Sequence, residues 1–202
     1  MDLGLKGKSV LVTGGNRGVG LAIALAFAEE GANVAVCGRD KAALADAEAK
    51  IAAKGVKAKA VAVDLFTAAG CSGAVQAAVD AFGGLDVLVN NASTAVSGNS
   101  SITAFVKQFS TTVAAQGITA NTVHPPFTKT DRYPKRLAAR AKQLGVSEAE
   151  AEASFVRQFP IGRLVEPKDI APMVLFLASP HASAITGQSI AIDGGSIPGI
   201  NY

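Results

Sequence analysis

Three glycines at the end of an apolar run are the residues of this chain whose spacing points most directly to chemistry. The run at positions 9–13 leads into Gly14, Gly18 and Gly20, and an alanine-rich helical segment follows. Gly14 allows a strand to end sharply, Gly18 allows backbone to approach an anion, and Gly20 allows the helix to pack closely on a sheet. The new helix directs its free N–H groups and positive dipole end toward a diphosphate. The pattern predicts a phosphate-binding strand–turn–helix unit.

Strands and helices must alternate along the chain to position this turn. Strand-like runs of near-continuous apolar character cover 8–13, 33–37, 60–63 and 85–89. Such strands, separated by helices, are typical of a parallel sheet with helices on both faces. We therefore predict an α/β, Rossmann-like, doubly wound fold in one domain, 1–202, with a helical lid at about 127–160. Ligands of such sheets bind beyond the carboxyl ends of the strands.

Local signals set the helix ends. The first helix is expected to run from the glycine turn to about Glu30, with Gly31 as its C-terminal cap. Asp40 is the expected N-cap of the second helix, and the third is expected over 72–82.

Composition limits the classes of partner. The 202 residues, 49% of them hydrophobic, suffice for one domain with a sizeable core. The net charge of +3 comes from well-mixed charges, which indicates no nucleic-acid surface. The N-terminus is too polar for a signal peptide and no run is long enough for a membrane span, so we expect a cytoplasmic protein. Cys37 and Cys71 are interpreted as reduced thiols, and no metal site is predicted.

Motifs in a fixed order resemble those of the short-chain dehydrogenase/reductase family. Thr13-Gly14-x-x-x-Gly18-x-Gly20 precedes Asp64, which ends the third strand, and Asn90-Asn91-Ala92 follows the fourth. The stretch at 118–125 resembles the family's sixth strand and the proline turn after it, and 186–195 resembles its last strand. The resemblance covers nearly all of the chain and implies an oxidoreductase that interconverts an alcohol and a carbonyl by hydride transfer.

The resemblance also implies a set of cofactor-binding residues. They are Gly14, Asn16, Arg17, Gly18, Val19, Gly20, Arg39, Asp64, Leu65, Asn91, Ala92, Pro125 and Thr128. Asp64 and Leu65 resemble the family's contact to the adenine, although Asp64 could instead cap the loop that follows.

The end of the second strand favours NADP over NAD. NAD-binding folds carry an acidic residue there for the ribose 2′-hydroxyl, whereas this chain has Cys37-Gly38 and then Arg39. The Arg39 guanidinium can pair with a 2′-phosphate, and Arg17 can add a second positive charge. The alternative is that Arg39 is a solvated loop residue and Asp40 still binds the hydroxyl.

The family's catalytic residues are missing from their expected place. The family uses a tyrosine with a lysine four residues later and a serine on the preceding strand, which is general acid–base chemistry. Alignment of the helix at 102–109 places Ala95 at the tyrosine position and Asn99 at the lysine position. About sixty residues, roughly two strand–helix units, are absent. The fold is therefore expected to lack one central strand and a crossover helix, which leaves the flanking strands either paired directly or with open edges.

No other residue replaces this catalytic set. Tyr133 follows a lysine, Lys129, in the reverse of the family order, and we interpret it as a loop residue. Tyr202 is a poorer candidate. His124 and His181 are far apart in the sequence and are interpreted as structural. No catalytic residue is therefore assigned.

Three interpretations remain open. The first is an NADP-dependent oxidoreductase from which an internal segment is missing, acting on a small-molecule carbonyl or alcohol. The second is a catalytically inactive NADP-binding sensor or assembly partner, and the third is a remnant that folds poorly. In each case the polypeptide as written is expected to lack efficient dehydrogenase activity. By resemblance, we expect a homodimer or homotetramer.

Overall fold

The computed structural model describes residues 1–92 and 99–197. The chain divides into two compact units. The N-terminal unit comprises Met1–Ser97 and Ala171–Ala182, and the C-terminal unit comprises Gly98–Ile170 and Ser183–Tyr202. Each unit contains its own parallel sheet.

Four parallel strands form the sheet of the N-terminal unit. These strands are β1 (Ser9–Thr13), β2 (Asn33–Gly38), β3 (Ala58–Ala62) and β4 (Val87–Val89). Their order is β3-β2-β1-β4, so β1 is paired on both sides: Leu11 lies opposite Ala35 on β2 and Leu88 on β4. The predicted parallel sheet is confirmed, with strand ends shifted by up to two residues.

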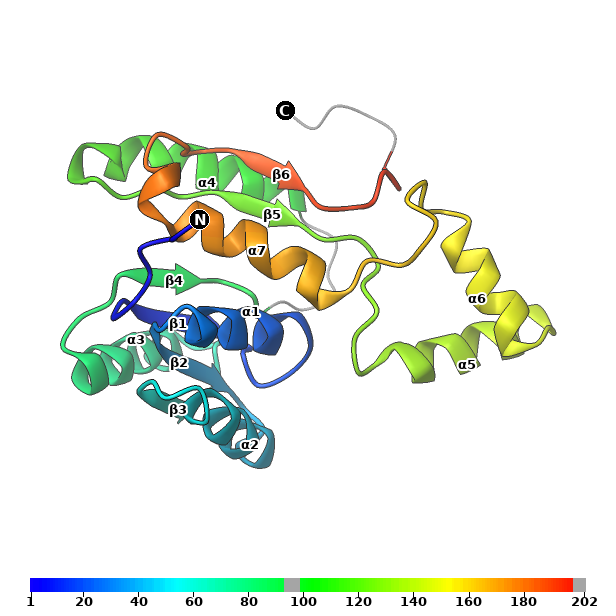
Figure 1. Cartoon of the computed structure of the whole chain (residues 1–202), viewed down its shortest axis with the longest axis horizontal. Helices are drawn as coiled ribbons and strands as arrows, with labels where there is room; N and C mark the ends of the chain where they lie inside the picture. Colours follow the sequence, from blue (N-terminus) through cyan, green and yellow to red (C-terminus); the bar gives the residue numbers. More distant parts are fainter. Residues whose placement is uncertain (93–98, 198–202) are drawn as a thin grey trace. The chain divides into compact units, whose positions relative to one another are not determined.

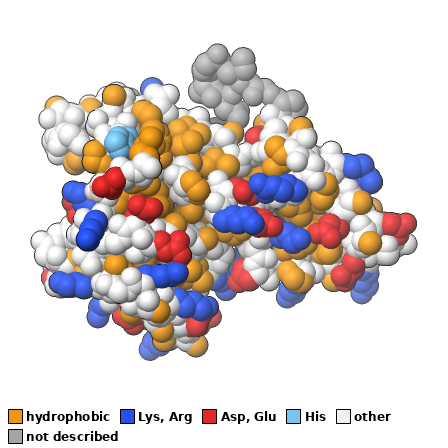
Figure 2. Space-filling view, in the orientation of Figure 1, with side chains coloured by type: hydrophobic (Ala, Val, Ile, Leu, Met, Phe, Trp, Pro, Cys, Tyr) orange, Lys and Arg blue, Asp and Glu red, His pale blue; other side chains and the backbone are white. Residues whose placement is uncertain are grey.

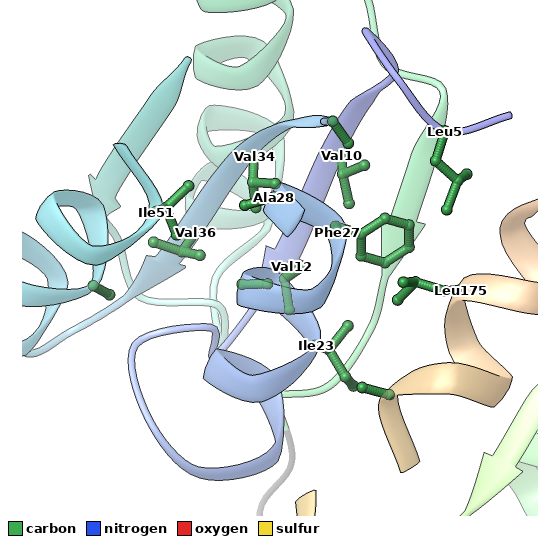
Figure 3. Close-up of a cluster of buried hydrophobic side chains, with 14 of the residues drawn as sticks. Leu5, Val10, Val12, Ile23, Phe27, Ala28, Val34, Val36, Ile51 and Leu175 are labelled. Carbon is green, nitrogen blue, oxygen red and sulfur yellow. The ribbon is translucent and has the colours of Figure 1, made fainter. Parts of the chain in front are cut away.

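Helices cover both faces of this sheet, as predicted. They are α1 (Gly18–Glu29), α2 (Lys41–Ala52), α3 (Ala68–Phe82) and α7 (Pro167–Ala178). One core cluster joins Val10 and Val36 of the sheet to Phe27 of α1, Ile51 of α2 and Leu175 of α7 (Figure 3). Alternate strand residues point to the other face, where Leu11, Ala35 and Cys37 pack with Ala74 and Ala78 of α3.

Capping explains where α2 and α3 begin. The Asp40 carboxylate accepts the Ala43 N–H at 3.1 Å, which confirms this N-cap. The third helix begins four residues before the predicted position because Thr67 caps it: the Thr67 hydroxyl accepts the Gly70 N–H at 3.0 Å.

The C-terminal unit has fewer strands than the N-terminal unit. Its elements are α4 (Asn99–Val113), a 3₁₀ turn (Ala114–Gln116), β5 (Thr122–His124), α5 (Tyr133–Leu144), α6 (Glu148–Val156) and β6 (Ser189–Ala191). The helices α5 and α6 lie next to each other within the segment expected to be helical, 127–160 (Figure 1). Strands β5 and β6 pair in parallel, with Val123 opposite Ile190.

The break between the two sheets falls at the predicted deletion. In the described part of the chain, β4 pairs with β1 and β5 pairs with β6, each within its own unit. On β4, Leu88 remains 47% exposed.

Candidate functional site

Thr13, the last residue of β1, joins the glycine turn to the loop after β4. Its hydroxyl accepts the N–H groups of Asn91 and Ala92, each at 3.0 Å, and donates to the Val89 carbonyl at 3.3 Å. The hydroxyl thus satisfies two backbone donors that would otherwise lack an acceptor. Thr13 belongs to the glycine motif, but its central position in this network was not predicted, because the partners lie more than seventy residues away.

Asn91 supplies the second connection. Its side-chain Nδ2 donates to the Thr13 carbonyl at 2.9 Å and to the Gly14 carbonyl at 3.3 Å. A Cβ atom at Gly20 would lie 2.5 Å from the Gly14 carbonyl oxygen and would also meet Asn91 Nδ2. Gly20 is therefore required by close packing against this amide, in addition to the packing of helix on sheet predicted from the motif.

The turn itself has the backbone that only glycine adopts readily. Gly14 and Gly18 have φ values of +62° and +56°, in the left-handed region. Arg17 precedes α1 with an exposed side chain that makes no capping hydrogen bond. Val19 packs at the margin of the core, so the first turn of α1 is anchored on one side while its N–H end is directed away from the core.

The end of β2 lies beside this turn. The Gly14 N–H donates to the Cys37 carbonyl at 2.8 Å, and the buried Asn16 side chain lies so close to Gly38 that a Cβ there would be 3.2 Å from Asn16 Oδ1. Arg39 follows and is exposed. The structure thus brings Gly14, Asn16 and Arg39 to one edge of the sheet, as predicted. Burial raises the pKa of the Cys37 thiol, which keeps it neutral there.

Asp64 and Leu65 lie at the end of β3 on the same edge. One Asp64 carboxylate oxygen accepts the Phe66 N–H at 3.1 Å, as the loop-capping alternative predicts, and the contact of Asp64 to the adenine stays a prediction. Leu65 lines a cavity of about 210 Å³ in the N-terminal unit. The other lining residues are Leu11, Thr13, Cys71, Ala74, Val75, Leu88, Asn90 and Ala92. Its walls are mostly apolar and its rim is polar, which suits a nucleobase.

Pro125 and Thr128 belong to the C-terminal unit. Pro125 is exposed after β5, whereas Thr128 is 8% exposed and its hydroxyl donates to the Pro126 carbonyl at 2.9 Å. The N–H of Lys129 donates to Val165, next to a parallel bridge between Thr128 and Val165. A contact from either residue to the cofactor remains a prediction.

The interpretation of Tyr133 as a loop residue is wrong: it is the first residue of α5, and its ring is held in a buried cluster. It is 4% exposed, its hydroxyl donates to Glu152 Oε1 at 3.1 Å, and Lys129 Nζ donates to the same oxygen at 3.2 Å. Burial and the Glu152 carboxylate raise the pKa of Tyr133 to about 12. A catalytic tyrosine needs the opposite shift, because it must exchange a proton near neutral pH.

The other candidate residues have structural neighbours or lie outside the described residues. His124 Nε2 is 2.8 Å from Ser189 Oγ, and His181 Nε2 is 2.8 Å from the Asp2 carbonyl. Ala95 and Tyr202 lie outside the described residues, and Asn99 is the first residue of α4. Within the described residues, no group of three His, Cys, Asp or Glu could hold a metal ion, and no helix has the length and apolar character to cross a membrane.

Family models match both parts of the chain. A short chain dehydrogenase model matches residues 8–102, and a model described as enoyl-(acyl carrier protein) reductase matches residues 98–196. An uncharacterized oxidoreductase of Methylorubrum extorquens is 33% identical, and the alignment covers 95% of this chain and 98% of the relative. The chain belongs to the short-chain dehydrogenase/reductase family. A further relative, the 3-oxoacyl-[acyl-carrier-protein] reductase of Vibrio cholerae, is 29% identical over 96% of this chain and 98% of its own length.

Solved structures of reductases share the fold. L-sorbose reductase from Gluconobacter frateurii, complexed with NADPH and L-sorbose, matches with a TM-score of 0.91 at 25% identity, over 99% of this chain and all of its own. Actinorhodin polyketide ketoreductase with NADPH matches with a TM-score of 0.85 at 25% identity, over 94% of this chain and 97% of its own.

The alignment length supports an internal deletion in this family member. The 243 aligned positions with the Methylorubrum oxidoreductase exceed the 202 residues of the chain by 41, so at least 41 aligned positions have no counterpart here. Nearly the whole relative is nevertheless covered. The missing positions therefore lie inside the alignment rather than at its ends.

Proposed function

We propose that this chain binds NADP(H) at the carboxyl edge of the β3-β2-β1-β4 sheet, with the diphosphate at the N-terminus of α1. The observation that carries the proposal is the turn from Gly14 to Gly20, with left-handed glycines and a helix start whose N–H groups can bind an anion. Thr13 and Asn91 hold this turn in place: the Thr13 hydroxyl accepts the Asn91 N–H, and Asn91 Nδ2 donates to the Thr13 carbonyl. The cavity at Leu65, Asn90 and Ala92 suits the adenine.

Two features favour NADP over NAD as the cofactor. Arg39 is exposed at the end of β2 and can form charge-assisted hydrogen bonds to a 2′-phosphate. Asp40, the residue that could bind a 2′-hydroxyl instead, uses one carboxylate oxygen to cap α2. Arg17 adds positive charge near the turn. The reductase structures crystallised with NADPH agree with this choice.

We further propose that the polypeptide as written does not transfer hydride efficiently. When bound, the nicotinamide supplies or accepts the hydride, but the substrate oxygen also needs a proton donor or acceptor. Tyr133 is buried against Glu152 with a raised pKa, which supports its structural role. The protein then acts as an NADP-binding sensor or assembly partner. If a missing internal segment restores the tyrosine and lysine, it acts as an alcohol–carbonyl oxidoreductase on a small molecule. A cytoplasmic homodimer or homotetramer is proposed in either case.

Titration calorimetry with NADPH and NADH tests the binding site. The unaltered chain should bind NADPH more tightly than NADH. Arg39→Ala should weaken NADPH binding by roughly 10- to 100-fold, the value of a charge-assisted pair, and leave NADH binding within about 2-fold. Arg140→Ala, which removes an arginine on α5 bonded to Gln143, is the matched control and should change neither. Absence of NADPH binding, or equal affinities for the two cofactors, would contradict the proposal.

A turnover assay tests the predicted inactivity. NADPH oxidation is followed with a panel of ketoses, 3-oxoacyl esters and aldehydes. No turnover above background is expected. Turnover that disappears in Gly18→Val, a substitution at a left-handed glycine of the turn, would refute the inactivity.

The intact mass of the protein from its natural source separates the two roles. A mass of 20.4 kDa supports the sensor or partner role. A mass about 6 kDa greater, corresponding to two strand–helix units, supports the oxidoreductase.

A further inference from the structure

An exposed phenylalanine lies beside the predicted phosphate-binding arginine. Phe66, in the loop between β3 and α3, is 68% exposed, and the Arg39 Cζ atom lies 5.8 Å from the centroid of its ring. The two residues approach because β2 and β3 are paired up to Gly38 and Ala62, so their following loops share an edge. Core packing does not explain why a phenylalanine stands at this position, since most of the surface of its ring faces solvent.

The loop that carries Phe66 is anchored by hydrogen bonds. The Phe66 N–H donates to Asp64 Oδ1 at 3.1 Å, and the Thr67 hydroxyl donates to the Asp64 carbonyl at 3.0 Å while it caps α3. The backbone of Phe66 is thereby fixed between the end of a strand and the start of a helix. A ring carried on an anchored backbone can favour one orientation of a flexible side chain such as that of Arg39.

We infer that Phe66 is a positioning residue for cofactor choice: it orients the Arg39 guanidinium toward the 2′-phosphate of NADP. A cation–π contact uses the flat face of the guanidinium, whereas hydrogen bonds to phosphate use the N–H groups around its edge. Both contacts can therefore exist together. In the described part of the chain Arg39 has no carboxylate partner, so these N–H groups are available for a phosphate.

The inference rests on the proposed binding of NADP(H), and it concerns selectivity rather than binding as such. Holding the arginine in place lowers the ordering cost of binding a phosphate, which is the general advantage of preorganisation. NADH has no 2′-phosphate and gains nothing from it. Phe66 therefore acts on the ratio of the two affinities.

Calorimetry on Phe66 variants tests this role. Phe66→Leu keeps apolar bulk but removes the ring face, and should raise the dissociation constant for NADPH by about 2- to 5-fold, as expected of an exposed cation–π contact. The NADH constant should remain unchanged. Phe66→Trp keeps an aromatic face and should retain the NADPH preference. In the Arg39→Ala background, Phe66→Leu should have no further effect, as a double-mutant cycle requires.

The outcomes separate the two proposals. If the unaltered chain fails to bind NADPH, the proposed function is wrong and the inference falls with it. If the unaltered chain prefers NADPH but Phe66→Leu weakens both cofactors equally, or neither, Phe66 does not position Arg39 and the inference alone is overturned. Thermal melting of each variant confirms that the exposed substitution has not unfolded the loop or the sheet.

Discussion

The two units of this protein differ most in how deeply their strands are buried. In the N-terminal unit, seven residues of β1 and β2 are 0% exposed on the two faces of the sheet: Val10, Leu11, Val12, Val34, Ala35, Val36 and Cys37. In the C-terminal unit, every described residue of β5 and β6 is half-buried or exposed. Two parallel sheets of one chain thus have unequal protection from water.

The number of strands explains this difference. β1 has a neighbour on each side and helices on both faces, so both its side chains and its backbone are covered. β5 has one neighbour and spans three residues, and isolated two-stranded sheets have little stability of their own. A buried cluster around α5 and α6 provides packing in the C-terminal unit, where Phe127 and Phe155 stack at 4.8 Å. Helices tolerate the loss of a central strand better than a sheet does, because helices satisfy their backbone internally.

The charged surface of α5 and α6 fits this account. Basic and acidic side chains alternate over these helices (Figure 2). Lys129 pairs with Glu152, and Arg140 bonds to Gln143. Such mixed charge is typical of a solvated helical surface and does not single out an anionic substrate.

The largest expected effect follows from the core of the N-terminal unit. Phe27 on α1 is 0% exposed and lies against both strand and helix residues. Phe27→Ala should lower the free energy of unfolding by about 3–5 kcal/mol, because it removes buried area and leaves a cavity. Phe105→Ala, at a 65% exposed position of the C-terminal unit, is the control and should cost at most about 1 kcal/mol, chiefly from the lost stacking on Phe109, whose ring centroid is 5.8 Å away. Urea unfolding measures both. Equal costs would show that the two units do not differ as described.

A smaller effect is expected at the Thr13 hydroxyl. Thr13→Val keeps the shape of the side chain but leaves the N–H groups of Asn91 and Ala92 without their acceptor. The expected cost is about 1–3 kcal/mol, with weaker NADPH binding. Thr13→Ser keeps the hydroxyl and should recover most of the loss. If the serine variant is as unstable as the valine variant, restoring the hydroxyl does not restore stability, and the hydrogen-bond network is not the cause of the loss.

The C-terminal unit should respond to acid through Asp169. Its carboxylate makes two hydrogen bonds to Arg163, at 2.6 and 2.9 Å, and these, with the Glu166 N–H, hold the pKa of Asp169 at about 2. A pKa below the unfolded value means that the stabilisation is complete above about pH 4 and is lost as the pH falls through 2. Because Arg163 is half exposed, we expect only about 1 kcal/mol.

Acid unfolding of Asp169→Asn tests this contribution. The variant should be less stable at neutral pH and should lack that part of the acid-dependent loss, so the two unfolding curves converge below about pH 2. Parallel curves at every pH would exclude the ion pair as the cause.

A change in stability of the same small size is expected at Tyr133, where the spectroscopic signal should be clear. Burial and Glu152 raise the pKa of Tyr133 to about 12, so its contribution to stability is complete below pH 10 and is lost as the pH rises through 12. Of the two tyrosines, one should ionise late in a titration of tyrosinate absorbance, and Tyr133→Phe should remove that late step. Stability should fall by about 1 kcal/mol from the lost hydrogen bond. Ionisation of both tyrosines near pH 10 would contradict the buried position.

Local patterns predicted a large part of this protein. The glycine spacing, the cap at Asp40 and the apolar strand runs depend on neighbours in the sequence, and the structure confirms each of them. The start of α3 was missed by four residues because threonine is a weaker capping signal than the helical periodicity that followed it.

Contacts between distant residues could not be predicted in the same way. Thr13 meets Asn91 and Ala92, and Arg39 meets Phe66, only because parallel pairing aligns the carboxyl ends of β1, β2, β3 and β4. The hydrogen bond from the Phe66 N–H to the Asp64 carboxylate likewise depends on the backbone of the loop after β3.

Sequence alone determined the fold class, the glycine-rich turn and the absence of the family's tyrosine and lysine from their expected place, since residue type and spacing carry this information directly. Tertiary structure decided which strands pair within each unit, four in one sheet and two in the other, and that Tyr133 is buried with its hydroxyl donating to Glu152. The physical reason is that strand pairing and burial depend on contacts between residues far apart in the sequence. The loss of a strand changes these contacts but leaves the local sequence patterns as they are.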